Sequence, residues 1–169
     1  MHRHIVNCIF VDDNPSSLSR MIKIMSNINR GHHRSYSLAY PDGDDLKNCH
    51  AMRYKELTIG IGDSENNLNI IFLDVKMNLV NLINDTEKYK IIKEEYGEHQ
   101  GLYIYDTIRE QNEDVSICFL TSALYDVKIQ ERVNNNSYTQ YIEKGSTGIA
   151  DMCKEVIEKF IKMKTKWEI

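Results

Sequence analysis

The sequence predicts an α/β protein built on a doubly wound, five-stranded parallel sheet that is flanked by helices. Short apolar runs alternate with amphipathic stretches along the chain, which is the pattern of strands joined by helical crossovers. The strongest run is continuously apolar, as in a strand that is buried on both faces of a parallel sheet. Crossovers of this kind are right-handed. The length of 169 residues fits one domain, residues 1–169.

The five expected strands are short runs rich in apolar, β-branched and aromatic residues: Ile5–Val11, Tyr36–Tyr40, a strand within Asn69–Met77, Val115–Leu120 and Tyr141–Ile142. In the third of these, four apolar residues lead directly into Asp74. The first strand likewise ends in Asp12 and Asp13. The carboxyl ends of both strands therefore carry acids.

Helices are expected between these strands. Asn14 stands as an N-cap before Pro15, the order that starts a helix, and an apolar stripe follows it. Asp85 and Gly97 are the expected start and stop of a charged helix in which Tyr89, Ile92 and Tyr96 share one face. The other expected helices cover about Asp45–Leu57, Gly101–Arg109, Leu124–Val133 and Ile149–Ile161, and the last has the clearest stripe.

Composition excludes several classes of protein. The apolar fraction of 41% is that of a globular protein, and the net charge of -4 gives no general attraction to nucleic acid or anionic membranes. No apolar run approaches the roughly 20 residues that span a bilayer. The four cysteines are widely spaced, which is typical of reduced thiols in a cytoplasmic protein and not of a disulfide framework or a zinc site.

Polar residues follow four of the five strands. In a doubly wound sheet the ends of the first, third, fourth and fifth strands meet at one edge, where ligands bind. Those ends carry the two N-terminal acids, Asp74, Thr121 and Lys144. Taken singly, Asp74 can simply end its strand, and the acid pair can be solvated loop residues. Their convergence on one crevice favours a functional site.

These residues give the sequence a resemblance to the receiver domain of bacterial response regulators. The resemblance rests on IFVDDNP, IFLDVKM, FLTSA and YIEKG, in that order along the whole chain. It implies a flavodoxin-like fold with strand order 2-1-3-4-5. It also implies that Asp74 is the phosphoacceptor and that Thr121 and Lys144 contact the phosphoryl oxygens.

The resemblance further implies a magnesium ion and a conformational switch. Asp13, Asp74 and the backbone carbonyl of Lys76 would bind Mg²⁺, with Asp12 acting mostly through water. Thr121 and Tyr141 would form the switch, although a tyrosine in a short strand can also be plain core. The charge of a cation and an amine around an aspartate nucleophile suits phosphoryl transfer.

The partners implied by the resemblance are a sensor histidine kinase or a histidine phosphotransfer protein. Beyond accepting and losing its own phosphoryl group, the chain is expected to catalyse no reaction. A homodimer would form through the helix near 124–133, the strand of Tyr141 and the last helix. Direct contact with nucleic acid or membrane is not expected. No motif identifies the kinase, the signal or the output.

The chain departs from the family in two ways. Asn78 and Gly145 stand where the family usually has proline, and insertions lie near residues 47–67 and 78–100. Since the second insertion begins close to Asp74, we hypothesise a flap, part of it helical, that limits access to this residue.

Two other functions remain open from the sequence. A degenerate receiver would act as a constitutive protein-interaction module. A phosphatase of the haloacid dehalogenase type also uses an aspartate nucleophile at a strand end, but such enzymes carry a second acid two residues later, where this chain has Lys76.

Overall fold

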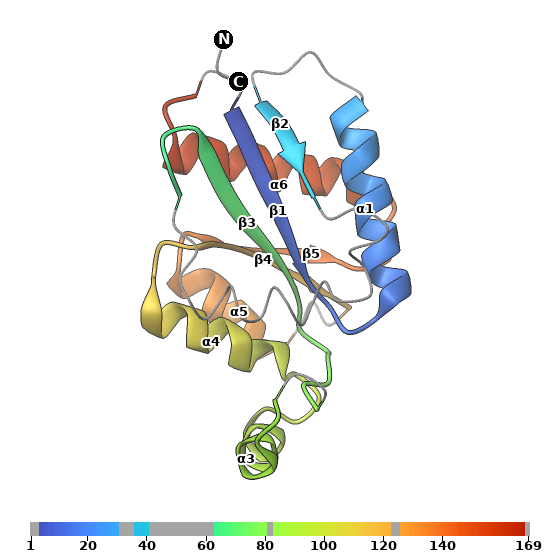
Figure 1. Cartoon of the computed structure of the whole chain (residues 1–169), viewed down its shortest axis with the longest axis vertical. Helices are drawn as coiled ribbons and strands as arrows, with labels where there is room; N and C mark the ends of the chain where they lie inside the picture. Colours follow the sequence, from blue (N-terminus) through green and yellow to red (C-terminus); the bar gives the residue numbers. More distant parts are fainter. Residues whose placement is uncertain (1–3, 31–35, 41–62, 81–82, 123–125, 168–169) are drawn as a thin grey trace.

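The computed structural model describes residues 4–30, 36–40, 63–80, 83–122 and 126–167, which form five strands and five helices (Figure 1). The strands are β1 (His4–Val11), β2 (Tyr36–Ala39), β3 (Asn67–Asp74), β4 (Ser116–Thr121) and β5 (Thr139–Glu143). The helices are α1 (Pro15–Arg30), α3 (Thr86–Tyr96), α4 (Gly101–Gln111), α5 (Val127–Asn135) and α6 (Ile149–Lys164). The helix expected over Asp45–Leu57 and most of the insertion near 47–67 lie outside the described residues.

The five strands form one sheet in the order β2-β1-β3-β4-β5, and every neighbouring pair is parallel. The α/β class, the parallel sheet and the strand order are therefore as predicted. The register aligns the strand ends, because Leu73 pairs with Val11, Asp74 with Leu120, and Thr121 with Glu143. The residues that follow β1, β3, β4 and β5 consequently lie along one edge of the sheet.

Apolar side chains pack on both faces of the sheet. Alternation along β1 sends Cys8 and Phe10 into a core formed with α1 and α6. Ile9 and Val11 enter a second core, formed with α3, α4 and α5. Burial on both faces is the reason that β3 reads as a continuous apolar run.

The helix ends follow the predicted capping signals. The side chain of Asn14 accepts a hydrogen bond from the Ser16 N–H at 2.9 Å, ahead of α1. Asp85 accepts from the Lys88 N–H at 3.0 Å, and Gly97, with φ of 59°, ends α3. The expected charged helix therefore exists with both of its predicted caps.

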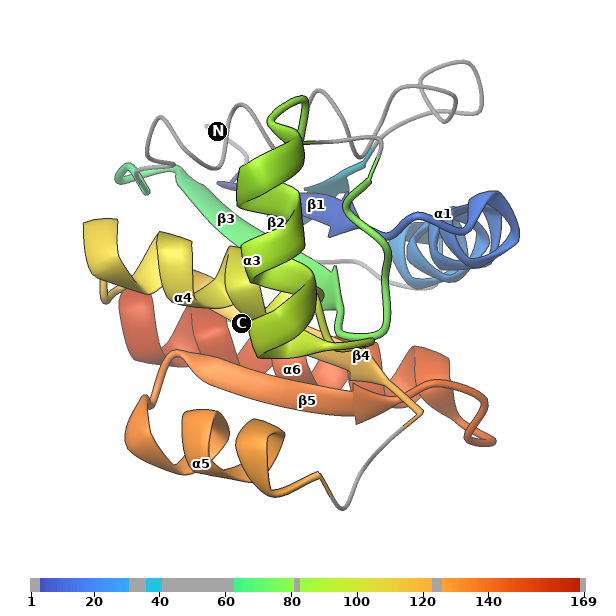
Figure 2. The ribbon, with the colours of Figure 1, turned by 90° about the horizontal axis from the view of Figure 1, so that it is seen from below.

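The helix α3 projects beyond the end of the sheet toward which β1 and β3 run (Figure 1). Seen from that end, it lies in front of the strands (Figure 2). Its predicted stripe is present, with Ile92 buried and two tyrosines partly buried against the second core. The segment before it is anchored too, because Leu79 and Ile83 are buried. The first part of the insertion thus belongs to the core, while α3 itself stands outside the sheet.

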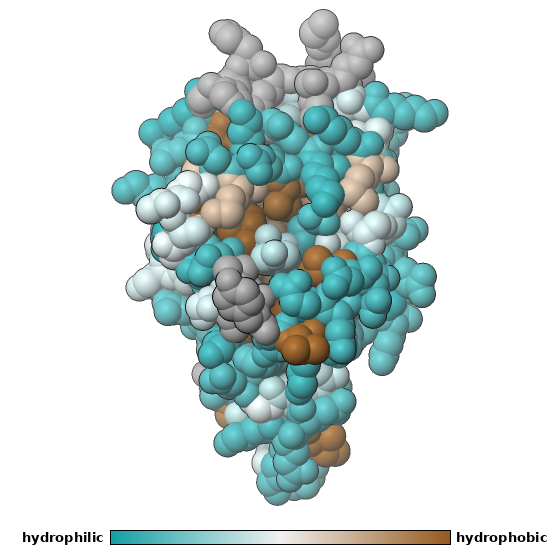
Figure 3. Space-filling model, turned by 180° about the vertical axis from the view of Figure 1, so that it is seen from behind, coloured by the Kyte–Doolittle hydropathy of each residue, from teal (hydrophilic) through white to brown (hydrophobic). Residues whose placement is uncertain are grey.

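The face of the molecule seen in Figure 3 is mainly hydrophilic, with scattered hydrophobic areas, one of them at the protruding end. This agrees with the charged, solvated face expected for the residues of α3. None of the described helices has the length and apolar character needed to cross a membrane. Cys8, Cys118 and Cys153 are buried free thiols.

Candidate functional site

Three carboxylates gather at the carboxyl edge of the sheet. Asp12 and Asp13 follow β1, and Asp74 is the last residue of β3. One oxygen of each lies within 4.8 Å of the others. Asp12 and Asp74 are buried, whereas Asp13 is exposed. The prediction that these acids come together at one edge of the sheet is confirmed.

Lys144, from the loop after β5, provides a positive charge in this cluster. Its Nζ lies 2.8 Å from Asp12 Oδ2 and 2.9 Å from Asp74 Oδ1. Burial opposes the charge of this amine, but the hydrogen bond with Asp12 and the charge of Asp74 raise the pKa of Lys144 above its ordinary value. Its backbone N–H also donates to the Thr121 carbonyl at 2.9 Å, which holds the loop against β4.

The carboxyl of Asp74 is the most perturbed acid of the cluster. Burial is the largest cause and Asp12 adds a neighbouring negative charge, and together they raise the pKa of Asp74 to about 6 in spite of Lys144. A displaced pKa beside a specific charged partner is a common property of functional carboxylates.

Within the described residues, the three carboxylates differ in how many of their oxygens accept a hydrogen bond or ion pair. Asp12 has both oxygens engaged, by the Asn14 N–H at 2.8 Å and by Lys144. Asp13 accepts through Oδ2 from the Asn78 N–H at 3.0 Å. Asp74 contacts Lys144 through Oδ1. One oxygen each of Asp13 and Asp74 is therefore left for another ligand.

This donor set fits a hard divalent cation. Three carboxylates and one ammonium leave a formal charge of about -2 when all are ionised. Mg²⁺ prefers one or two carboxylates together with water and phosphate oxygens. Asp13 and Asp74 are the direct ligands that the free oxygens allow, whereas Asp12 is better placed to act through water. The structure thus supports an acidic cluster capable of holding a metal ion.

Thr121 and Tyr141 lie near this edge on neighbouring strands. Thr121 is buried at the end of β4, and Tyr141 on β5 is 40% exposed. Tyr141 pairs with Phe119, which is two residues before Thr121, so the two side chains lie on the same face of the sheet. Tyr141 is therefore not a core residue.

The loops differ from the family pattern in ways that the backbone explains. No cis peptide bond occurs among the described residues, and Gly145 has φ of 93°, which proline cannot adopt. Lys76 directs its amine away to Glu98, at 3.0 Å. The predicted ligand role concerns the backbone carbonyl of Lys76 and does not involve this amine.

Two residues contact the site in ways that the sequence does not indicate. The backbone of Gly101, at the start of α4, packs so closely on β3 that a Cβ there would lie 1.9 Å from the Asp74 carbonyl oxygen. Asn78 is notable in the sequence only as a missing proline, yet its N–H binds Asp13. Neither contact follows from spacing or composition, because both depend on how the insertion folds back.

The similarity of this chain to known proteins is one of fold. No family model matches the sequence, and no curated protein matches it significantly. Among solved structures, it is similar to a chain described as a yeast Spc42 trimeric coiled coil, amino acids 181–211, fused to another structure. That likeness has 13% identity and a TM-score of 0.54, and it covers 93% of this chain and 79% of the other. At this identity it shows a shared fold alone.

A second solved structure is a two component response regulator from Cytophaga hutchinsonii. It is 15% identical, has a TM-score of 0.45, and the match covers 95% of this chain and 99% of the other. A TM-score of this size carries no functional conclusion. The fold and the acidic cluster define the protein as an α/β protein with a candidate cation site at the carboxyl edge of a five-stranded parallel sheet.

Proposed function

We propose that the chain is a receiver domain that accepts a phosphoryl group on Asp74 in a Mg²⁺-dependent reaction. The observation that carries the proposal is the convergence of three carboxylates within 4.8 Å, two of which share Lys144. Such a site combines a nucleophile, a place for a cation and a fixed positive charge. The resemblance of the strand-end motifs to response regulators supports this reading, and a doubly wound, flavodoxin-like arrangement is part of it.

The chemistry assigned to the site is simple. The ionised carboxylate of Asp74 forms a bond to the phosphorus of the donor, and the bond to the donor breaks with its electron pair staying on the leaving group. Lys144 stabilises the negative charge on the phosphoryl oxygens, and the Thr121 hydroxyl is proposed as a second contact. A bound Mg²⁺ would supply further positive charge between the acids and the phosphoryl group. Asp13, Asp74 and the Lys76 carbonyl are its proposed ligands, with Asp12 acting through water.

Phosphorylation is proposed to act as a switch. It adds about -1.5 to -2 charges at the edge of the sheet. Movement of Thr121 toward these charges would open space on the face that it shares with Tyr141. The surface of α5, β5 and α6 would then change its affinity for a partner or for a second copy of the chain. The exposed position of Tyr141 supports an outward state before phosphorylation.

The proposed phosphodonor is a sensor histidine kinase or a histidine phosphotransfer protein, and the proposed location is the cytoplasm. The domain itself would contact neither nucleic acid nor membrane. Acceptance and loss of its own phosphoryl group are the only reactions that we propose.

The test is incubation with a small phosphodonor and Mg²⁺, followed by intact-mass measurement. Wild type should gain one phosphoryl group, and chelation of the metal should prevent it. Asp74→Asn should gain none, whereas Asp151→Asn, which alters an exposed acid of α6, should label normally. Labelling of the Asp74 variant contradicts the assignment. Absence of any adduct favours a degenerate receiver, and turnover of an unrelated phosphoester favours a phosphatase.

A further inference from the structure

The exposed acid of the cluster is held by the insertion. Asp13 is the one exposed carboxylate of the three, and an exposed side chain is free to change rotamer unless a contact fixes it. The backbone N–H of Asn78 donates a hydrogen bond to Asp13 Oδ2, at 3.0 Å. Occupation of Oδ2 by this donor leaves the other oxygen for a cation. The Asn78 N–H therefore fixes the orientation of a candidate metal ligand.

Asn78 is in turn held by α3. Its side-chain Oδ1 accepts two hydrogen bonds, one from the Val80 N–H at 2.9 Å and one from the Tyr89 hydroxyl at 3.0 Å. Tyr89 belongs to the inserted helix and is partly buried against the second core. A continuous line of hydrogen bonds thus runs from α3 to the acidic cluster.

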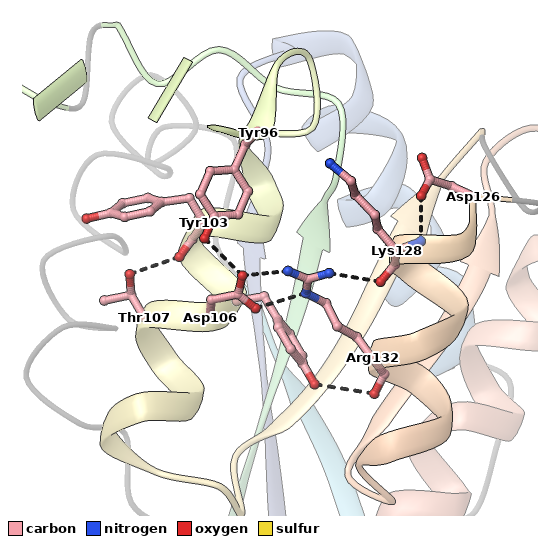
Figure 4. Close-up of polar contacts among 8 residues, drawn as sticks. Tyr96, Tyr103, Asp106, Thr107, Asp126, Lys128 and Arg132 are labelled. Carbon is pink, nitrogen blue, oxygen red and sulfur yellow. Dashed lines mark hydrogen bonds and ion pairs between the residues drawn. The ribbon is translucent and has the colours of Figure 1, made fainter. Parts of the chain in front are cut away.

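The position of Tyr89 is determined by anchors elsewhere in the insertion. The Gln100 side chain accepts from the Leu79 N–H at 2.8 Å and donates to the Gly97 carbonyl at 3.1 Å, so it joins the two ends of the insertion. At the far end of α3, the Tyr96 hydroxyl donates to Asp106 at 3.0 Å. Arg132 of α5 holds the same carboxylate with two nitrogens, at 2.9 and 2.6 Å (Figure 4).

We infer that Asn78 and Tyr89 are positioning residues for the metal ligand Asp13, which makes the inserted helix a part of the cation site. A group that hydrogen-bonds a metal ligand raises the affinity of the site for the metal, because it fixes the ligand's orientation before the ion binds. Asn78 does so directly, and Tyr89 does so by fixing Asn78. The inference rests on the proposed function, because that function supplies the cation.

Calorimetric titration of the whole chain with Mg²⁺ tests the inference. Loss of a residue that hydrogen-bonds a metal ligand lowers metal affinity by about 10- to 100-fold. Tyr89 contacts Asn78 and not Asp13 itself, so we expect a smaller decrease in Mg²⁺ affinity, about three- to tenfold, for Tyr89→Phe. Tyr103→Phe is the matched control, since Tyr103 is partly buried against the same core, and the hydrogen bonds of Asn78 within the described residues do not include it. It should bind Mg²⁺ like wild type.

Asn78→Ala keeps the N–H that binds Asp13 but removes the acceptor of both the Tyr89 hydroxyl and the Val80 N–H. Its Mg²⁺ affinity should fall at least as far as that of Tyr89→Phe, and if Tyr89 acts only through Asn78, the double variant should match Asn78→Ala. A merely structural role would lower the unfolding temperature without changing the affinity of the folded protein. Equal Mg²⁺ affinity in Tyr89→Phe, Tyr103→Phe and wild type overturns the inference alone. Absence of Mg²⁺ binding by wild type overturns both the inference and the proposed function.

Discussion

Lys144 and Asp74 form an ion pair at the carboxyl edge of the sheet, with 2.9 Å between Nζ and Oδ1. The same amine contacts Asp12, so one positive charge is paired with two buried carboxylates. Each of the three groups would be costly to bury alone. The site therefore holds excess negative charge in a fixed geometry, which is the property that a divalent cation or a phosphoryl group requires.

Removal of Lys144 should destabilise the protein in a pH-dependent way. Loss of one partner from a buried ion pair costs about 3–5 kcal/mol, and because Lys144 is partly exposed we expect about 2–4 kcal/mol for Lys144→Met at pH 7. The loss should shrink toward pH 5 as Asp74 becomes protonated. Urea unfolding without metal measures this, with Lys162→Met on the exposed face of α6 as control. An equal loss at both pH values contradicts the prediction.

The raised pKa of Asp74 predicts how its removal affects stability. Its carboxyl has a pKa of about 6 in the folded protein against 3.8 ordinarily, so it contributes stability below about pH 4 that is lost as the pH rises through 6. The difference corresponds to about 3 kcal/mol. Because asparagine does not titrate, Asp74→Asn should gain up to this amount relative to wild type between pH 4 and pH 7 in chelator. Added Mg²⁺ should narrow the gap by binding wild type. If the difference in unfolding free energy between Asp74→Asn and wild type stays constant with pH, the pKa of Asp74 is not raised by folding.

Gly101 should be intolerant of a side chain. Alanine normally stabilises a helix relative to glycine, by about 1 kcal/mol. Here the added Cβ would lie 1.9 Å from the Asp74 carbonyl oxygen, so we expect Gly101→Ala to destabilise the protein by about 3 kcal/mol. Displacement of Asp74 should also reduce phosphodonor labelling of the folded fraction. Glu110→Ala, at an exposed position of the same helix, serves as control. Unchanged stability in Gly101→Ala would mean that β3 and α4 separate easily.

Arg132 should matter for the attachment of α3. Lysine cannot reproduce the two parallel contacts of the guanidinium with Asp106, so Arg132→Lys should lower the free energy of unfolding by about 1–2 kcal/mol. Since Tyr96 binds the same carboxylate, amide exchange in α3 should accelerate more than in α6. Arg20→Lys on the exposed side of α1 is the control. Equal acceleration in both helices would argue for global destabilisation only.

The sequence alone determined the sheet and most of the site. A run such as Ile70–Leu73 is a local pattern, and its continuous apolar character requires a strand covered on both faces. Once the strands are parallel, the residues after them must meet at one edge, so Asp12, Asp74 and Lys144 were predictable as neighbours. The caps of α3 were predictable for the same reason, because Asp85 and Gly97 act on their own helix.

Tertiary structure alone decided how the insertion meets this edge. The donor that holds Asp13 is the backbone N–H of Asn78, a group that every residue except proline carries, so no side-chain pattern indicates it. The pairing of Arg132 with Asp106 depends on how α5 lies beside α4. The closeness of Gly101 to Asp74 depends on the path of a long segment between β3 and α4. That path is set by the burial of Leu79, Ile83 and Ile92 against a core built from distant parts of the chain, which local sequence does not encode.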